Sequence, residues 1–496
     1  MKIFLSVVFL IYISNLEAGD YGDLYGAHPA ANGVGNAVTA TVNDSSSVFY
    51  NVAGLGKQNE ADKIFAKMEI QAKDALDPNA NPPPPPINKN FRKKFQDFLR
   101  DSWTEIKTDN FKNIPAYRSE KTPHELVLQY NIARPRLNTS APTNQDLERT
   151  RDDYTGLNLG LNLNSIYNLK RNFRFGLNVI LPASGNLLAV NDVNPNAHRY
   201  LMHGASNQKP IIMGGLGIEV IKDILYAGVG FTALASGSGS ILLKDVPISP
   251  DRVAPNQQVI LEVKPMINPT YGLAFQYGKF LGGVSYRREV ALDINSLPAR
   301  AQTTLLGIQL DFDVSLFDLF TPRKWSYGIG YKPTKKLTLM ASIDRELWSA
   351  YRLSRTKATY NQRVYFDDIT IPRAGIEYAF TDWLKLRAGL ARRPRPTPVM
   401  ADTWSTDFKN LFTAGDRWNL MDFDRMIYTG GISLIAPPGL YGYLPNLKSP
   451  IIIDLVVEYQ KLHGEHVYKA NPTPTNPNYS AGGNVIHFGI SFTAYL

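Results

Sequence analysis

Residues 156–164 read GLNLGLNLN, and this stretch decides the fold class. Leucine alternates with asparagine or glycine, so successive side chains belong to two unlike faces. A period of two is typical of an extended strand. In a soluble sandwich the leucines would face a protein core. In an outer-membrane barrel they would face lipid, and the asparagines would face a wet lumen.

The same alternation recurs in several later segments, at 171–183, 209–220, 224–235, 383–391 and 450–462. Very short connections, such as Lys222–Asp223 and Gly278–Lys279, alternate with long ones rich in Pro, Asn and Asp. Tight turns at one end and long loops at the other are typical of transmembrane barrels. The sequence therefore predicts an all-β fold, a transmembrane antiparallel β-barrel. A large secreted sandwich or solenoid is the alternative.

We expect about 14 strands, an even number that places both ends of the strand series on the short-turn side of the barrel. Sixteen stays open, because Glu125–Asn131 and Gln257–Lys264 also look extended, although we place both in loops. The expected strands are 61–71, 153–168, 171–183, 209–220, 224–235, 268–277, 280–293, 303–332, 336–350, 365–380, 383–393, 423–436, 450–462 and 484–496.

The first 18 residues have the pattern of a secretory signal peptide, removed at or near Ala18. Lys2 precedes the apolar run Ile3–Ile13, which is too short to span a bilayer as a helix. At the other end, the alternating segment NVIHFGISFTAYL (484–496) is typical of the strand that barrel assembly machinery receives during insertion. No later apolar run is long enough for a membrane helix, so a membrane protein made from this chain must cross with strands.

The composition of the chain disfavours several classes of function. The formal charge is +9, but Lys and Arg are scattered, which disfavours nucleic acid and suits anionic lipid and glycolipid. Without cysteine there is no disulfide, thiolate metal site or cysteine nucleophile. His463 and His466 lack zinc-motif spacing, and G-x-S-x-G is absent. We expect no cofactor, metal or enzymatic activity, with an outer-membrane lipase or protease as the enzymatic alternative.

A Pro-rich insertion at about 72–152 is expected in the first outer loop, where PPPPP (82–86) precedes a stretch with helical periodicity. Its apolar face would carry Phe91, Phe95, Phe98, Leu99 and Trp103. Two interpretations stay open: a helix packed across the barrel mouth, or a capture surface for a hydrophobic substrate.

The stretch Gly26–Gly56 resembles the N-terminal signature of the FadL-type outer-membrane transporters of long-chain fatty acids and aromatic hydrocarbons. In place of the family's proline this chain has Val52. The matching residues are Asp44, Ser45, Phe49, Asn51, Ala53, Gly54 and Leu55. Similar segments follow in the same order at Ser285–Ile294, Tyr331–Ser349, Asp368–Pro396 and Met421–Leu434.

The resemblance implies a 14-stranded barrel, residues 59–496, plugged by an N-terminal hatch at 19–58. It also implies passive, hatch-gated diffusion of hydrophobic molecules with lateral exit through the wall. The gating segment would be Phe49, Tyr50, Asn51, Val52, Ala53 and Gly54. We expect a monomer in the outer membrane of a diderm bacterium. A general porin or a surface adhesin on the same barrel is the alternative.

If the substrate carries a carboxylate, that group needs a cation or hydrogen-bond donors nearby. By strand phase, Arg174, Lys385 and Arg387 face inward and are candidate partners. The competing interpretation for each is a salt bridge within the lumen, to Asp454, Glu458 or Glu219.

Overall fold

The computed structural model describes a set of ranges that covers the barrel wall and the N-terminal part of the chain. These ranges are 21–59, 124–143, 153–164, 172–182, 198–200, 202–203, 211–234, 239–243, 247–249, 252–253, 257–261, 267–291, 300–305, 308–313, 320–350, 366–397, 420–436, 449–468, 472, 474 and 477–495. Within them, no helix has the length and hydropathy needed to cross a bilayer. The predicted signal peptide lies outside the described residues.

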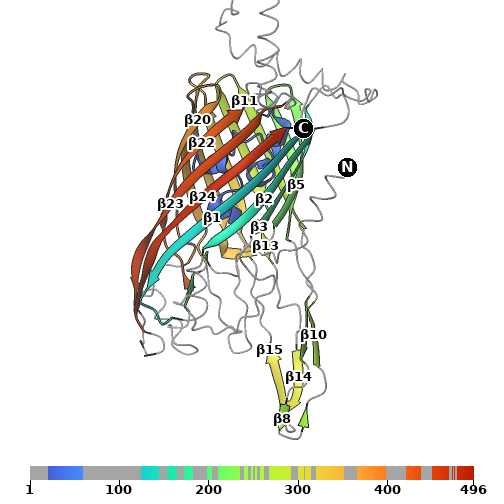
Figure 1. Ribbon diagram of the computed structural model, residues 1–496, viewed down its shortest axis with the longest axis vertical. Coiled ribbons are helices and arrows are strands. Elements are labelled where there is room, and N and C mark those ends of the chain that lie inside the picture. The colour runs from blue at the N-terminus through green and yellow to red at the C-terminus, as the bar shows by residue number, and fades with distance from the viewer. Residues whose placement is uncertain are drawn as a thin grey trace, which may run out of the picture.

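Fourteen antiparallel strands form a closed barrel, as the sequence predicts (Figure 1). Their bounds are β1 Glu125–Thr139, β2 Tyr154–Asn164, β3 Phe173–Pro182, β5 Ile211–Ile221, β6 Leu225–Leu234, β11 Ile267–Tyr277, β12 Phe280–Arg287, β17 Arg323–Tyr331, β18 Leu337–Leu347, β19 Ile369–Ala379, β20 Leu384–Arg393, β22 Arg425–Ala436, β23 Ile451–Val467 and β24 Tyr479–Tyr495. The last strand closes the wall against the first, from Glu125 opposite Tyr495 to Thr139 opposite Ala481.

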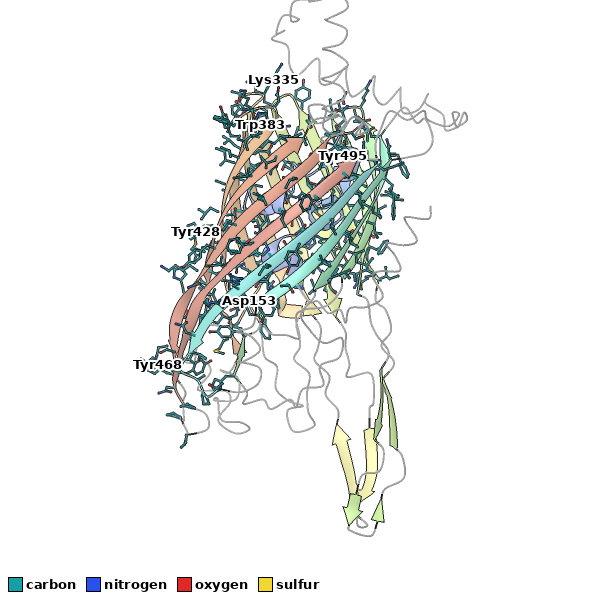
Figure 2. The ribbon with its side chains drawn as sticks, in the orientation of Figure 1. Asp153, Lys335, Trp383, Tyr428, Tyr468 and Tyr495 are labelled. Carbon is teal, nitrogen blue, oxygen red and sulfur yellow. The ribbon has the colours of Figure 1, made fainter. Side chains whose placement is uncertain are left out.

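The stretch GLNLGLNLN lies in β2, and the exposure of its side chains shows which face of the strand is on the outside of the barrel. Leu157 is 38% exposed on the outer face of the barrel, whereas Asn162 is 0% exposed on the inner face. Large apolar side chains are exposed along most of the other strands as well, and Figure 2 shows Trp383 and Tyr428 projecting outward. An outer face of this composition suits lipid rather than water.

The first strand of the barrel differs from the prediction. β1 is Glu125–Thr139, which we placed in an outer loop, while the expected strand at 61–71 lies outside the described residues. The closed barrel has fourteen strands with β1 as the first, so the predicted even count is confirmed. The burial of β1 alternates strictly from Glu125 to Ala133, in agreement with the wall position. The predicted insertion at 72–152 is therefore wrong in its second half, since part of it is barrel wall.

Other predicted strand boundaries also differ from the structure, because several segments form two-stranded sheets outside the barrel. The segment expected as one strand at 303–332 contributes only β17 to the wall; β14 (Arg300–Leu305) and β15 (Ile308–Asp313) pair with each other. β10 (Gln257–Leu261) pairs with β7 (Gly239–Leu243), so it lies outside the barrel as expected. The remaining two-stranded sheets join β4 (Arg199–Tyr200) with β21 (Leu420–Met421), β8 (Pro247–Ser249) with β9 (Arg252–Val253), and β13 (Val290–Ala291) with β16 (Phe320–Thr321).

Candidate functional site in the barrel lumen

Residues 21–59, called the N-terminal segment below, lie inside the barrel (Figure 1, blue). The segment contains α2 (Tyr21–Tyr25), α3 (Pro29–Asn32), α4 (Ser47–Tyr50) and the 3-10 helix η2 (Val52–Gly56). α3 contacts β22, β23 and β24, and η2 contacts β3, β5, β6 and β11 on another part of the wall. This position agrees with the one that the FadL resemblance implies for a hatch.

Glycines on the inner face of the strands let the N-terminal segment approach the wall closely. A Cβ atom added at Gly272 would lie 2.1 Å from Asn51 Oδ1, and one at Gly389 would lie 2.1 Å from the Gly35 nitrogen. The same conflict, below 3.0 Å, arises at Gly217, Gly228, Gly283, Gly328 and Gly375. Any side chain at these positions would push the segment away from the wall.

The predicted gating residues form the join between α4 and η2. Asn51 Nδ2 donates hydrogen bonds to Thr39 O at 2.8 Å and to Leu273 O at 3.0 Å, and its Oδ1 accepts from Ala53 N at 3.2 Å. A single side chain thus caps η2, holds the segment in its bend and ties it to β11. Gly54 is equally constrained, because a Cβ there would lie 2.5 Å from Val42 O.

Val52, where the family has proline, occupies the first position of η2. A proline suits that position, since the first N–H of a helix has no partner within the helix. Asn51 before it is extended, at φ −161° and ψ 104°, close to the extended region that a following proline favours. The departure from the family pattern therefore leaves the backbone in a proline-compatible conformation, and the Val52 side chain packs over Gly215.

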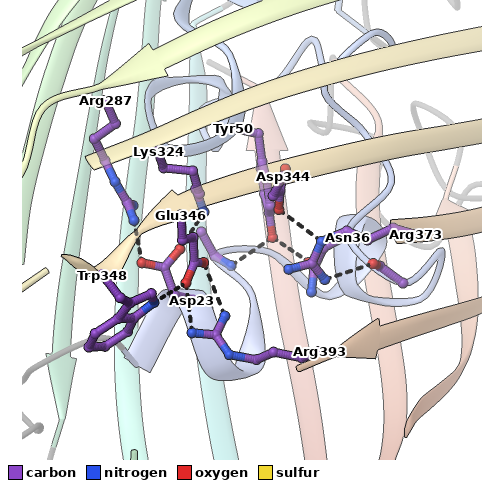
Figure 3. Close-up of polar contacts among 12 residues, drawn as sticks. Asp23, Asn36, Tyr50, Arg287, Lys324, Asp344, Glu346, Trp348, Arg373 and Arg393 are labelled. Atoms are coloured by element: carbon purple, nitrogen blue, oxygen red, sulfur yellow. Dashed lines mark hydrogen bonds and ion pairs between the residues drawn. The ribbon is translucent and has the colours of Figure 1, made fainter. Parts of the chain in front are cut away.

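A buried ionic cluster holds α2 to the wall (Figure 3). Asp23 Oδ1 accepts from Lys324 Nζ at 2.5 Å, and its other oxygen pairs with Arg287. The Phe49 ring covers both cations, with its centroid 5.2 Å from Arg287 Cζ and 5.3 Å from Lys324 Nζ. Burial by itself raises the pKa of Asp23, but the two cations outweigh it and hold the pKa below its usual range.

Tyr50 links two parts of the N-terminal segment. Its hydroxyl donates to Asn36 Oδ1 at 2.6 Å and accepts from Ala27 N at 2.9 Å. Burial raises the pKa of Tyr50 above its usual range, so the phenol stays neutral and keeps its donor. Arg373 on β19 lies beside this link, donating to Gly35 O at 3.2 Å and to Asp344 on β18 at 2.9 Å.

A second buried ion pair joins β18 to β20. Arg393 donates to both carboxylate oxygens of Glu346, at 3.0 and 2.8 Å. Trp348 Nε1 donates to the same carboxylate at 2.9 Å, as Figure 3 shows. Such a bidentate arrangement fixes both side chains in position.

The three predicted carboxylate partners have different surroundings. Arg387 pairs with Glu377 at 2.7 Å and with Asp454 at 3.0 Å, which confirms the lumen salt bridge. Arg174 is fully buried on β3. Lys385 and Arg387 line a cavity of about 140 Å³, which also borders the N-terminal segment at His28, Val34 and Asp44. Contact of any of the three with a substrate stays a prediction.

The predicted capture helix, with Phe91, Phe95, Phe98, Leu99 and Trp103, lies outside the described residues. Its expected place in an outer loop stays a prediction. Among the described residues, His124 precedes β1 at the short-turn end of the barrel. There His124 Nδ1 accepts a hydrogen bond from Asn164 N at 3.1 Å, at the end of β2. Gly56, before the insertion, packs against Ile218–Glu219 near the short turn after β5. Both flanks of the insertion are thus at that end.

Sequence reasoning missed the ionic clusters that hold the N-terminal segment and the wall together. The residues are Asp23, Arg287, Lys324, Asp344, Glu346, Arg373 and Arg393. A signal was available, since Asp344 and Glu346 share a strand face within a predicted strand and a charge on the lumenal face needs a partner. The sequence did not reveal which cation would supply it.

Comparison with known proteins yields distant relatives. No family model matches. The chain is 24% identical over 192 residues to alkane uptake protein A of Marinobacter nauticus; the match covers 37% of this chain and only 38% of that protein. A FadL homologue of Pseudomonas aeruginosa has a TM-score of 0.49 at 13% identity, over 97% of this chain and 98% of that one. The toluene transporter TodX of Pseudomonas putida has a TM-score of 0.40 at 11% identity, over 75% and 89%.

The signature at Gly26–Gly56 and the N-terminal segment inside the fourteen-stranded barrel support the same family as the sequence similarity to alkane uptake protein A does. The chain is similar to the FadL-type outer-membrane transporters.

Proposed function

We propose that this protein passes hydrophobic molecules, long-chain fatty acids or aromatic hydrocarbons, across the outer membrane of a diderm bacterium by passive diffusion. The N-terminal segment acts as the hatch, and the substrate leaves sideways through the barrel wall. The observation that carries the proposal is the close fit of the segment to the lumenal glycines around the wall.

The hatch role follows from packing. Protein interiors tolerate little overlap, so a segment in contact with β3, β5, β6, β11, β22, β23 and β24 obstructs diffusion through the lumen until it moves. A porin keeps an aqueous channel instead. The buried Asp23 cluster and Asn51 are the contacts that opening has to break.

Apolar side chains on the outward side of the Asp23 cluster support a hydrophobic substrate class. Tyr200, Met202, Trp348, Phe366, Met421 and Phe423 are buried there in one cluster with the N-terminal segment, beside the ion pairs Asp422–Arg425 and Glu346–Arg393. Burial of each CH₂ group contributes about 0.8 kcal/mol, so a molecule with a long acyl chain gains most from such a cluster. The relative alkane uptake protein A is named for a substrate of this kind.

Two measurements test the proposal. In planar bilayers, the intact protein is expected to conduct ions poorly, and deletion of residues 19–58 is expected to open a large current. In a diderm host that takes up oleate poorly, expression is expected to raise uptake of radiolabelled oleate. Large currents from the intact protein would identify a porin. Unchanged uptake after replacement of Asn51–Gly54 by a flexible linker would reject gating by that segment.

A further inference from the structure

Three exposed cations lie in one row across the outer face of the wall. Arg136 on β1 is paired with Asn484 on β24, and Asn484 is paired in turn with Lys461 on β23. The row continues through Met426 on β22 to Arg392 on β20. Neighbouring strands are roughly 4.8 Å apart, so cations on alternate strands are spaced by roughly 10 Å. Together with Arg134, two residues before Arg136 on the same exposed face, these cations are called the cationic row below.

The cationic row begins where the apolar outer surface ends. On each of its three strands, exposed apolar side chains lead up to the cation. They are Leu126, Leu128 and Tyr130 on β1, Leu455, Val457 and Tyr459 on β23, and Leu386 and Leu390 on β20. All three strands run away from the short turns, so the row lies toward the long-loop end of the barrel, which is the outer side in such proteins. Figure 2 shows Asp153, beside the row, toward the end of the wall opposite to Trp383.

Acidic neighbours neutralise only part of this charge. Asp153 pairs with Arg134 at 3.1 Å and with Arg136 at 3.6 Å, and Asp424 pairs with Arg392 at 3.3 Å. The arginine side chains in these pairs are 51%, 59% and 62% exposed, and such surface pairs contribute only about 0–1 kcal/mol. Each guanidinium has five N–H donors, so these arginines retain donors for a further anion.

Lys461 occupies the centre of the cationic row. Its exposed side chain lies between Met426 and Asn484, neither of which carries a charge. The Asn484 amide adds hydrogen-bonding groups between Lys461 and Arg136. Four cations against the two carboxylates of the paired acids leave two positive charges on the row. The row is therefore complementary to a ligand with two anionic groups.

The position of the row restricts the ligand further. A ligand that fits has anionic groups spread along the row and acyl chains that cover the apolar side chains beside it. Free phosphate meets only the first condition. A fatty acid has one carboxylate, which cannot reach cations roughly 10 Å apart at the same time. Guanidinium groups bind phosphate oxygens in bidentate geometry, which favours phosphate as the anionic group.

We propose that the cationic row binds the phosphorylated glycolipid of the outer leaflet, with the phosphates on the row and the acyl chains along β1, β24 and β23. The inference rests on the outer-membrane location given under the proposed function and does not depend on transport. Because Arg136 and Lys461 lie on the two strands that flank β24, a glycolipid bound there bridges the interface at which the barrel closes.

A double substitution tests the cationic row. R136Q/K461Q removes two exposed cations, and surface changes of this kind usually alter stability by less than about 0.5 kcal/mol. K335Q/K336Q is the matched control, since it removes the same charge from exposed side chains at the short-turn end. Native mass spectrometry of the purified protein measures binding of diphosphorylated lipid A. Binding is expected to weaken about tenfold in R136Q/K461Q and to stay within about twofold in the control. Equal affinity of R136Q/K461Q and the unaltered protein would overturn the proposal.

The chemical form of the ligand is tested with three probes. Diphosphorylated lipid A is expected to raise the melting temperature of the unaltered protein in neutral detergent. Lipid A stripped of both phosphates and inorganic phosphate are both expected to leave it unchanged. Equal stabilisation by the stripped lipid would show that acyl chains alone bind, and stabilisation by inorganic phosphate would show a site for free anions. Either result rejects a glycolipid site.

These measurements separate the cationic row from the proposed transport. If the unaltered protein binds diphosphorylated lipid A through the row but cells that express it take up no oleate, the glycolipid site is supported and the transport proposal is rejected. If oleate uptake is raised but lipid A binds both double variants equally, the row is rejected and transport is supported.

Discussion

Lys324 on β17 and Asp23 in the N-terminal segment form an ion pair of 2.5 Å, with side chains only 9% and 4% exposed. The two residues are 301 positions apart in the sequence, and the pair exists only while α2 lies in the lumen. Because both charges are desolvated, loss of one partner leaves the other uncompensated. This ion pair is one of the contacts that hold the N-terminal segment in the lumen, beside those of Asn51 and Arg373.

Asp23→Asn is expected to loosen the N-terminal segment. It removes the charge that both Lys324 and Arg287 need, at a cost of about 3–5 kcal/mol if the cations stay buried. The matched control is Glu289→Gln, which removes the partner of Arg323 in a pair that is partly exposed, at 40% and 21%. Single-channel recordings are expected to show frequent openings for D23N and none for E289Q. Equally silent recordings from both variants would mean that the Asp23 cluster does not hold the segment.

Mild acid is expected to leave this cluster closed. The pKa of Asp23 is lower in the folded state than the value of about 3.9 for an unfolded chain. Such a group stabilises the fold at every pH above the unfolded pKa, and its contribution is lost only as the pH falls through the folded pKa. Recordings at pH 7 and pH 5 are therefore expected to match. Openings that appear at pH 5 in the intact protein would have to arise from another group.

Gly389→Ala is expected to displace the N-terminal segment without altering the lipid-facing surface. The new methyl group would lie 2.1 Å from the Gly35 nitrogen, and overpacking of this kind costs about 1–3 kcal/mol. Gly430→Ala, on the neighbouring strand β22, is the control, since nothing lies within 4 Å of its added Cβ. Urea unfolding followed by tryptophan fluorescence measures the difference. Similar destabilisation by both substitutions would show that contact with the segment is not the cause.

Arg393→Gln is expected to destabilise the barrel by about 3–5 kcal/mol, because it leaves Glu346 buried without its cation. Arg392→Gln is the control on the adjacent residue. It removes the same charge from a side chain that is 62% exposed, where an ion pair contributes about 0–1 kcal/mol. Urea unfolding of the two variants measures the difference, and equal midpoints for R392Q and R393Q would show that the buried pair contributes no more than the exposed one.

Val52→Pro is expected to fold and function normally. The backbone before it is already extended, and a compatible proline stabilises a protein by about 0.4–1 kcal/mol. Ala53→Pro, one residue later, removes the N–H that donates to Asn51 Oδ1 and is expected to raise ion currents. Melting temperatures and single-channel recordings of the two variants test this difference. Loss of folding in V52P would show that the chain no longer accepts the family's proline.

Several features could be predicted from local pattern. The alternation in GLNLGLNLN placed leucines outside and asparagines inside β2, and the short and long connections gave the barrel and its strand count. The signature around Asn51 pointed to a segment with special contacts. The first strand was the main error, because Glu125–Asn131 and 61–71 both look extended and local pattern does not tell which one pairs with the last strand.

Periodicity is a property of neighbouring residues, so the sequence by itself determined which face of each strand is apolar. Closure into a barrel decided that those faces lie on the outside. Partners are decided by closure of the barrel, which brings Glu125 beside Tyr495 and Asp23 beside Lys324. Charges so far apart in the chain meet only after every register between them has formed. For the same reason, the ion pair between Glu346 on β18 and Arg393 on β20 became visible only in the tertiary structure.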